Sequence, residues 1–195
     1  PGATGSPVIR DVLAWIDCRI DAVHEAALAG AALVVFPEAF IPGYPAWIWQ
    51  LRPGTDMGRT EQLHARLRAQ AVSVAGDDLR PLRLAAREHA VTVVCGIEEI
   101  DAEFSRGTLY NTVVVIGPDG LLQNRHRKLM PTNPERMVWG LGDASGLKVV
   151  DTPCGRVGTM ICWESYMPLA RSALYAQGVQ LCVAPTYDSG DRWIA

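Results

Sequence analysis

The sequence predicts an α/β protein built around a mixed sheet, and two observations support this fold class. Amphipathic helical segments alternate along the chain with short apolar runs of the kind that form buried strands. Two expected strands, at about 108–116 and 121–127, flank the turn sequence Gly-Pro-Asp-Gly at 117–120 and predict a hairpin. Helices alternating with strands, together with one hairpin, indicate a layered α/β fold with a mixed sheet.

The elements are expected in a definite order. A long helix begins at Pro7, with Ser6 as its cap, and stops at Gly30, because apolar and charged residues recur on opposite faces. The run ALVVF at 32–36 has the continuous apolar character of a strand covered on both faces. The remaining expected elements are helices at about 57–75, 78–90 and 163–177, and strands at about 91–97, 147–151, 157–161 and 179–184.

Composition limits the classes of function. The chain has 195 residues, enough for one well-buried domain, and no linker divides it, so we expect a single domain over 1–195. The net charge of −3 argues against nucleic acid or an anionic membrane as a partner, and no apolar run approaches the ~20 residues that span a bilayer. The five cysteines form no C-x-x-C pair, which favours free thiols in the cytoplasm over disulfides or a metal site.

The stretch VGTMICWESYMPLARSALYAQG, residues 157–178, is the first candidate for chemistry. Its first half predicts a short buried strand and its second half a helix, so Cys162 falls on the turn between them. The free backbone N–H groups and the dipole of a helix N-terminus favour a thiolate there, and serine hydrolases lift their nucleophile from a sheet in a similar way. The alternative is an inert core cysteine, since free Cys is among the most buried residue types.

Glu38 directly follows the apolar strand at 32–36, beside Phe36 and Phe40. A carboxylate in such poorly solvated surroundings suits a general base, although a solvated loop glutamate is the ordinary alternative. The next stretch is rich in Pro, Gly and aromatic residues. Its Tyr44, Trp47 and Trp49 are expected to line an apolar pocket, or else to form a hydrophobic plug or a subunit contact.

Lys128 comes at the end of the second hairpin strand. A lysine held among apolar neighbours there places a cation beside an anionic intermediate, whereas the alternative is a solvated basic turn of His126, Arg127 and Lys128. Glu135 follows seven residues later and either pairs with Lys128 or lies on the surface. The Gly-rich loop near 141–146 lacks the strand–G-x-G-x-x-G–helix context, so we expect no nucleotide site.

A thiol, a carboxylate and an amine therefore each lie where a strand gives way to a loop, and ligands of open α/β sheets bind at the carboxyl ends of strands. These three groups suffice for covalent acyl chemistry. The carboxylate takes the thiol proton, the thiolate attacks an electrophilic carbon, and the cation stabilises the developing negative charge.

Three motifs add a family resemblance. VVFPEAFIPGYP, HRKLMPTNPER and GTMICWESYMPLARSALYAQGVQL, in this order, resemble the nitrilase superfamily of carbon-nitrogen hydrolases, and its true nitrilase branch in particular. The resemblance spans residues about 28–195. It implies a four-layer αββα sandwich and a catalytic triad of Glu38, Lys128 and Cys162, with Glu135 as the additional glutamate of the extended site.

The resemblance also implies a reaction and its partners. Cys162 adds to a nitrile to form a thioimidate, which becomes a thioester with loss of ammonia, and water activated by Glu38 then releases the carboxylic acid. The implied substrate is a small nitrile contacted by Tyr44, Trp163 and Tyr187, with no cofactor or metal. Trp163 matches the nitrilase form of the motif, and its backbone N–H is expected to contribute to the oxyanion site. Family members assemble as dimers or longer helical homo-oligomers.

Two features depart from the family pattern. Relatives open with a strand before the first helix, which residues 1–7 do not supply, and they continue beyond the PTYDSGDRW stretch near Ala195. We therefore expect a fragment, incomplete at both termini, that lacks strands of the sheet.

Other functions stay open at this stage. The nearest alternative is an amidase or carbamoylase with the same triad. A second is a Cys–His hydrolase with His126 as base, because His126 and Lys128 share a face if the strand continues that far. A third is a truncated, inactive chain that serves only as an assembly module.

Overall fold

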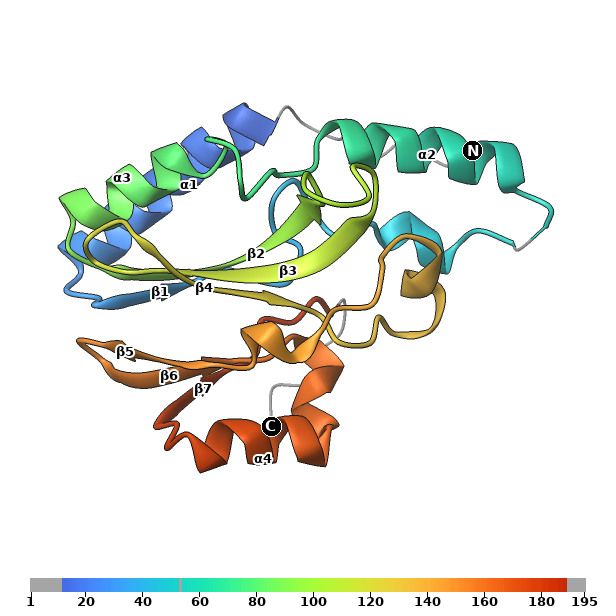
Figure 1. Ribbon diagram of the computed structural model, residues 1–195. Coiled ribbons are helices and arrows are strands. Elements are labelled where there is room, and N and C mark those ends of the chain that lie inside the picture. Colours follow the sequence, from blue (N-terminus) through green and yellow to red (C-terminus); the bar gives the residue numbers. More distant parts are fainter. Residues whose placement is uncertain (1–11, 53, 189–195) are drawn as a thin grey trace.

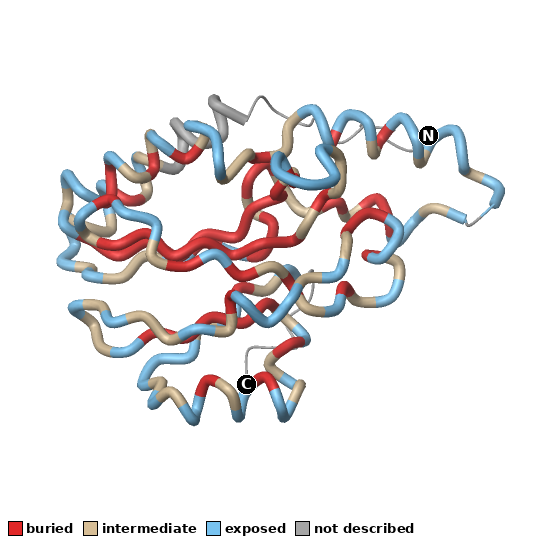
Figure 2. The backbone as a smooth tube through the Cα atoms, viewed as in Figure 1, coloured by how far each residue is buried: buried red, intermediate tan, exposed pale blue. Residues whose placement is uncertain are grey.

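The computed structural model describes residues 12–52 and 54–188, with side chains from residue 20 onward. One sheet holds the first half of the chain in the order β1-β2-β3-β4, and β1 runs parallel to β2 while the other neighbours are antiparallel. Its strands are β1 (Leu33–Val35), β2 (Thr92–Ile100), β3 (Leu109–Ile116) and β4 (Leu122–Arg127). The central strands β2 and β3 are buried on both faces (Figure 2), which explains their continuous apolar runs.

A second sheet holds the later strands in the order β5-β6-β7, namely β5 (Val149–Thr152), β6 (Gly155–Thr159) and β7 (Leu181–Val183). β5 and β6 form an antiparallel hairpin, and β6 is parallel to β7. The connection between β6 and β7 contains the 3-10 helix η4 (Cys162–Tyr166) and the helix α4 (Pro168–Ala176). Along the chain, Cys162 therefore falls between β6 and α4. In space it packs against the apolar cluster between the two sheets.

Helices cover the outer faces of the sheets (Figure 1). The helices α1 (Val12–Leu28) and α3 (Arg80–Glu88) lie on one side of the first sheet, the second sheet lies on its other side, and α4 lies beyond the second sheet. The helix α2 (Met57–Ala69) projects at one end. Short 3-10 helices complete the described elements: η1 (Ala46–Trp49), η2 (Asn133–Met137) and η3 (Ala144–Gly146). Among the described helices, none is long and apolar enough to cross a membrane.

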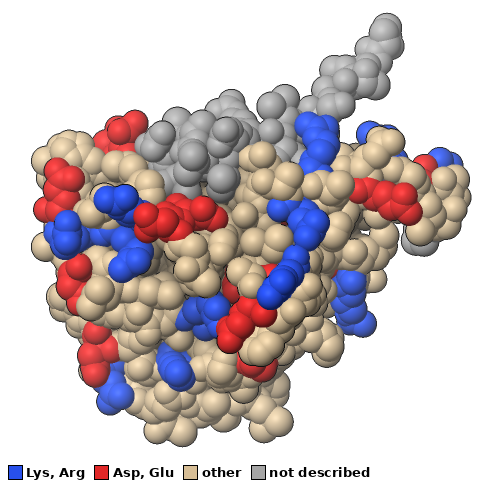
Figure 3. Space-filling model, turned by 45° about the horizontal axis from the view of Figure 1, so that its top comes forward, with Lys and Arg blue, Asp and Glu red and all other residues tan. Residues whose placement is uncertain are grey.

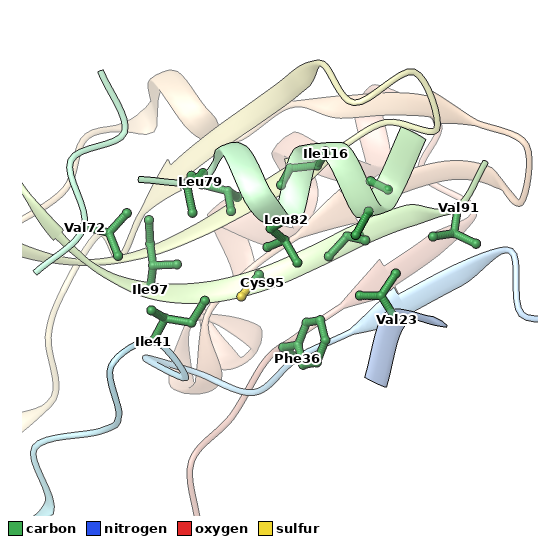
Figure 4. Close-up of a cluster of buried hydrophobic side chains, with 14 residues drawn as sticks. Val23, Phe36, Ile41, Val72, Leu79, Leu82, Val91, Cys95, Ile97 and Ile116 are labelled. Carbon is green, nitrogen blue, oxygen red and sulfur yellow. The ribbon is translucent and has the colours of Figure 1, made fainter. Parts of the chain in front are cut away.

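Three apolar clusters hold these layers together. The largest packs α1 and α3 against β2 and β3 and includes Val23, Leu82 and Cys95 (Figure 4). A second joins the two sheets through Val94, Val113, Val115 and Ile161, and a third packs α4 on the second sheet through Met160, Ala170 and Leu174. Because side chains alternate along β2, its neighbouring residues contribute to different layers.

The mixed α/β class expected from the sequence is confirmed, with corrections to several boundaries. The helix expected at 57–75 ends at Ala69, because Val72 pairs with Glu99 at the end of β2, and the helix expected at 78–90 is limited to Arg80–Glu88. The strand expected at 91–97 extends to Ile100, because its pairing with β3 continues to that residue. The proposed cap Ser6 and helix start Pro7 lie outside the described residues.

Charged side chains of both signs are interspersed on the face shown in Figure 3.

Candidate active site

Glu38 lies just past the carboxyl end of β1 and is only 2% exposed. Its Oε1 accepts hydrogen bonds from Lys128 Nζ (2.7 Å) and Asn111 Nδ2 (2.8 Å), and its Oε2 accepts one from the backbone N–H of Tyr187 (2.9 Å). The alternative of a solvated loop glutamate is therefore wrong. A buried carboxylate of this kind depends on such donors for its charge.

Gly96 on β2 makes room for this glutamate. A Cβ at Gly96 would lie 2.8 Å from Glu38 Cα and 2.7 Å from Ala39 N, distances that real Cβ atoms essentially never show. The Gly96 carbonyl also accepts hydrogen bonds from the N–H groups of Phe40 and Ile41. The segment that carries Glu38 therefore lies directly on the glycine backbone.

Lys128 follows β4 and is 1% exposed, so the alternative of a solvated basic turn is wrong at this residue. Its ammonium lies between Glu38 Oε1 (2.7 Å) and Glu135 Oε2 (2.8 Å). Burial opposes the charge, but the two carboxylates outweigh it and raise the pKa of Lys128 above its ordinary value. Lys128 is consequently a permanent cation at the centre of the site.

The Gly-rich loop that follows η2 supports this lysine. A Cβ at Gly142 would collide with the backbone of Arg127 and Lys128, and one at Gly146 would collide with that of Arg125 and His126. The N–H of Gly142 donates to the Lys128 carbonyl at 2.8 Å. These glycines allow the loop to pack against β4, which gives the motif a structural explanation.

Glu135 lies in η2 and connects the charged cluster to the aromatic loop. Its Oε2 accepts from Lys128 Nζ and from the N–H of Thr132 (2.6 Å), and its Oε1 accepts from the Tyr44 hydroxyl (2.7 Å). Burial and the nearby Glu135 charge raise the pKa of Tyr44, so its hydroxyl stays protonated as a donor. Trp49 Nε1 in turn donates to the Tyr44 oxygen at 3.1 Å.

Cys162 opens η4 with a φ of +52°, in the left-handed region. Burial first, and then the Glu38 carboxylate, raise the pKa of its thiol to about 12, while Lys128 and the N–H of Trp163 act in the opposite direction. The expected thiolate at a helix N-terminus is therefore corrected. Only the four remaining residues of the 3-10 helix follow Cys162 directly, α4 begins at Pro168, and desolvation dominates.

Backbone strain gathers around these side chains. Ala39 (φ +46°) directly follows Glu38, and Asn133 (φ +48°) lies two residues before Glu135. With Cys162, three non-glycine residues at or beside the cluster adopt the left-handed conformation. Such strain costs free energy and persists only where the surrounding structure enforces it, as it commonly does at functional sites.

A pocket of about 430 Å³ opens onto Cys162 and Glu135. The three residues expected to contact substrate, Tyr44, Trp163 and Tyr187, all line it, and the rings of Tyr44 and Tyr187 stack at 4.1 Å. Its other lining residues are Ala46, Trp49, Gln50, Thr132 and Asp188. A larger hollow of about 740 Å³ runs along α2, and none of the candidate catalytic residues lines it.

Trp47 was expected in this pocket, and that expectation is wrong. Its side chain is 9% exposed and packs in a core cluster with Leu63, Val138 and Trp139. In contrast, Trp49 two residues later lies at the surface and lines the pocket. The sequence does not distinguish them because η1 turns one indole inward and the other outward.

Several residues of the site were missed by sequence reasoning. Asn111 on β3 holds Glu38, and a polar residue inside an otherwise apolar strand was the available signal. Glu98 is fully buried and accepts from Trp139 Nε1 at 2.5 Å, and burial raises the pKa of this carboxyl well above its ordinary value. The Trp139 ring lies 5.9 Å from Lys128 Nζ, so this pair borders the cluster. The residues described contain no group of three or more His, Cys, Asp or Glu suited to a metal.

Comparison with known families agrees with this geometry. The model of the family described as "Carbon-nitrogen hydrolase" matches residues 8–194. The chain belongs to the carbon-nitrogen hydrolase family. The resemblance inferred from the three motifs is therefore confirmed at the level of the family.

Curated relatives are named nitrilases. The chain is 45% identical to the aliphatic nitrilase of Sinorhizobium fredii (strain HH103), over 97% of this chain and 60% of that protein. It is 42% identical to nitrilase 1 of Arabidopsis thaliana, over 96% of this chain and 54% of that protein. This carbon-nitrogen hydrolase chain thus spans little more than half the length of these relatives.

Solved structures of the family share the fold. The amidase from Nesterenkonia sp. AN1 aligns with a TM-score of 0.66 at 20% identity, over 93% of this chain and 64% of that one. A carbon-nitrogen hydrolase from Helicobacter pylori G27 aligns with a TM-score of 0.65 at 20% identity, over 90% and 56% of the two chains. At these identities the likeness concerns the fold alone.

Proposed function

We propose that this protein is a nitrilase, which hydrolyses an organic nitrile to the carboxylic acid and ammonia. The observation that carries the proposal is the buried Glu38–Lys128–Glu135 ion cluster, whose charges act on the Cys162 thiol, while Glu135 and Cys162 line an aromatic pocket. The names of the curated relatives support the same reaction. The presence of Trp163 directly after the nucleophile favours a nitrile over an amide as substrate.

The first step starts from a neutral thiol. Because burial keeps Cys162 protonated, a base must take its proton as the sulfur attacks the nitrile carbon. Glu38 is that base: its Oε1 accepts two hydrogen bonds and its Oε2 only one from the described residues, so Oε2 has room for a proton. Glu38 then passes this proton to the nitrile nitrogen, which restores the carboxylate and leaves a thioimidate on Cys162.

Water completes the reaction in two further steps. One water adds to the thioimidate carbon, and loss of ammonia leaves a thioester. A second water, deprotonated by Glu38, attacks the thioester and releases the carboxylic acid and the free thiol. Lys128 and the Trp163 N–H stabilise the negative charge that develops in the tetrahedral species, and Glu135 orients water.

Other expectations stay predictions. We propose that the layers in Figure 1 correspond to the family's αββα sandwich and that residues 1–195 belong to one domain. A cytoplasmic location and assembly as a homo-oligomer also stay predictions. The aromatic lining of the pocket supports an arylaliphatic or aromatic nitrile, whereas the name of the Sinorhizobium relative directs a parallel test to aliphatic nitriles.

The test is intact-protein mass spectrometry with phenylacetonitrile or a short aliphatic nitrile, together with an ammonia assay. We expect an acyl adduct and ammonia release, both absent in Cys162→Ala. Each nitrile is compared with its own amide at equal concentration. Faster turnover of the amide would make the protein an amidase, and turnover in Cys162→Ala would exclude covalent catalysis at this cysteine.

The Cys–His alternative has its own test. His126 is fully buried and bonds Glu164 rather than lying among the pocket residues. We therefore expect Glu38→Gln to abolish turnover and His126→Ala to retain part of it. Activity in Glu38→Gln with none in His126→Ala would support the alternative.

A further inference from the structure

Glu164 is a fully buried carboxylate that the mechanism above does not use. It lies in η4 and accepts three hydrogen bonds from three places in the chain. They come from the backbone N–H of Ile161 (2.6 Å), the backbone N–H of Leu129 (2.5 Å) and His126 Nε2 (2.8 Å). Ile161 directly precedes Cys162, and Leu129 directly follows Lys128.

We propose that Glu164 is a positioning residue that fixes Lys128 relative to Cys162 by binding the backbone next to each of them. Its effect on catalysis rests on the proposed nitrilase function, whereas its effect on the thiol does not. Among the described residues, the Glu164 carboxylate does not line the pocket and makes no hydrogen bond to Glu38, Lys128 or Glu135. It therefore acts through the two backbone segments.

The architecture explains why such a link is needed. Lys128 extends from the first sheet and Cys162 from the second. The sheets contact each other through an apolar cluster, including Val113, Val115 and Ile161, and apolar contact has little directional preference. Hydrogen bonds to a charged acceptor are shorter than neutral ones and roughly twice as strong, and every hydrogen bond prefers a narrow range of distance and angle. The Glu164 carboxylate therefore supplies a fixed distance that the apolar layer does not.

His126 completes the arrangement as the third donor. Its Nδ1 is buried and has no hydrogen-bond partner, so a proton there would be an unpaired donor in the interior. The geometry assigns the Nε2–H tautomer, which donates to Glu164 Oε2. His126 also lies two residues before Lys128 on the buried face of β4. All three donors thus stabilise the Glu164 anion, and two of them belong to the lysine segment.

A simple helix cap would not require this geometry. Capping η4 needs only the bond to the Ile161 N–H, three residues back. The bond to Leu129 crosses to a segment 35 residues away.

Two variants separate the capping role from the positioning role. Glu164→Asp keeps the charge and a capping side chain, but its side chain is one methylene too short to reach both segments. Glu164→Gln keeps the length but places its own amide N–H against at least one of the backbone N–H donors.

The experiment measures both turnover and thiol chemistry. We expect each variant to lower kcat, per active site titrated by acylation, by about 10- to 100-fold, with KM changed less than threefold, because misplacement of about 1 Å can cost this much. Peptide mass spectrometry follows iodoacetamide labelling of Cys162 against pH. Glu38, Glu135 and Lys128 are the charges that act on this thiol. A displaced Lys128 lowers its pKa less, so we expect the labelling curve to shift to higher pH.

Asp78→Asn is the matched control. Asp78 is also a carboxylate that accepts a backbone N–H bond, from Ser73 at 2.8 Å, and this bond lies away from both catalytic segments. We expect this control to lower thermal stability without changing kcat per titrated site or the labelling curve. His126→Ala leaves both backbone bonds of Glu164 and is expected to lower kcat less than Glu164→Gln.

The outcomes are distinguishable. If both Glu164 variants reduce only the folded fraction, with kcat per titrated site and the Cys162 labelling curve as in the wild type, the proposal is overturned. If the wild type hydrolyses no nitrile, the proposed function fails, yet the labelling curves still test the positioning. If Glu164→Gln does not fold, Glu164→Asp supplies the same comparison with the charge retained.

Discussion

At the scale of single residues, the site keeps the Cys162 thiol, the proposed nucleophile, neutral and the Lys128 ammonium, the proposed electrostatic stabiliser, charged. Burial raises the pKa of Cys162 to about 12, while two carboxylates keep the Lys128 ammonium protonated. A thiolate would be reactive without substrate, but it would also be exposed to oxidation and alkylation. A neutral thiol beside a buried base is activated only when the electrophile is in place. Cys162 in the resting protein is consequently expected to resist general thiol reagents.

The pH dependence of alkylation tests this conclusion. Thiolate is the reactive form, so a thiol with a pKa of about 12 has a thiolate fraction that rises about tenfold for each pH unit below that value. We expect the iodoacetamide rate at Cys162, measured by peptide mass spectrometry, to climb steadily from pH 7 to 10. Free cysteine, with a pKa of about 8.5, is the reference and levels off in this range. A plateau at Cys162 below pH 9 would contradict the raised pKa.

The residue scale also shows what the sequence could reveal. Glu38, Lys128 and Cys162 were found because each lies at or just past the end of an expected strand, and strand ends meet at one edge of a layer. Their partners were not found, because Asn111 and Glu98 lie inside strands, where a polar residue signals burial but not its partner. The side-chain bond between Asn111 and Glu38 joins residues 73 apart in sequence. No local pattern encodes such a pairing.

At the scale of elements, β2 supports the turn that carries Glu38, the proposed base. The turn after β1 packs on Gly96, and any side chain there must displace the backbone of Glu38 or Ala39. We expect Gly96→Ala to lower kcat by about 100-fold through a displaced base and to cost about 1–3 kcal/mol of stability through overpacking. Turnover per titrated site and thermal unfolding measure the two effects separately.

Gly58→Ala provides the control for this substitution. Gly58 lies in α2, and a Cβ there meets nothing within 4 Å. Alanine favours a helix over glycine by up to about 1 kcal/mol, so we expect stability to stay equal or rise slightly and turnover to be unchanged. Wild-type turnover in Gly96→Ala would show that the turn carrying Glu38 can move without consequence.

Element boundaries show where sequence patterns lose information. The helical pattern at 57–75 is genuine, but the bridge from Val72 to Glu99 removes its last residues from α2. Similarly, the helical spacing after Cys162 is correct for α4, yet Pro168 begins that helix and η4 occupies the turn. In both cases a tertiary contact or a proline overrides local propensity. The strand ends, and therefore the site, were less affected because apolar runs end where burial ends.

At the scale of the whole molecule, the site belongs to neither sheet alone. Glu38, Lys128 and Glu135 follow strands of the first sheet, while Cys162 follows the second. The apolar layer between the sheets therefore sets the distance between nucleophile and charges, together with the Glu164 link. The outer layers, beneath α1, α3 and α4, stabilise the fold without separating these groups. Equal losses of packing in different layers should consequently have unequal effects on turnover.

Two neighbouring valines on β2 allow this to be tested with one type of substitution. Val94 packs between the sheets and Val93 packs under the helices, and both are 0% exposed. Either change to alanine removes two methyl groups and is expected to cost about 1–3 kcal/mol of stability. Only Val94→Ala loosens the layer between nucleophile and lysine, so we expect its kcat to fall about tenfold while that of Val93→Ala stays near the wild type. Kinetics well below each melting temperature give the comparison, and equal kcat values would mean that the intersheet layer does not control the site.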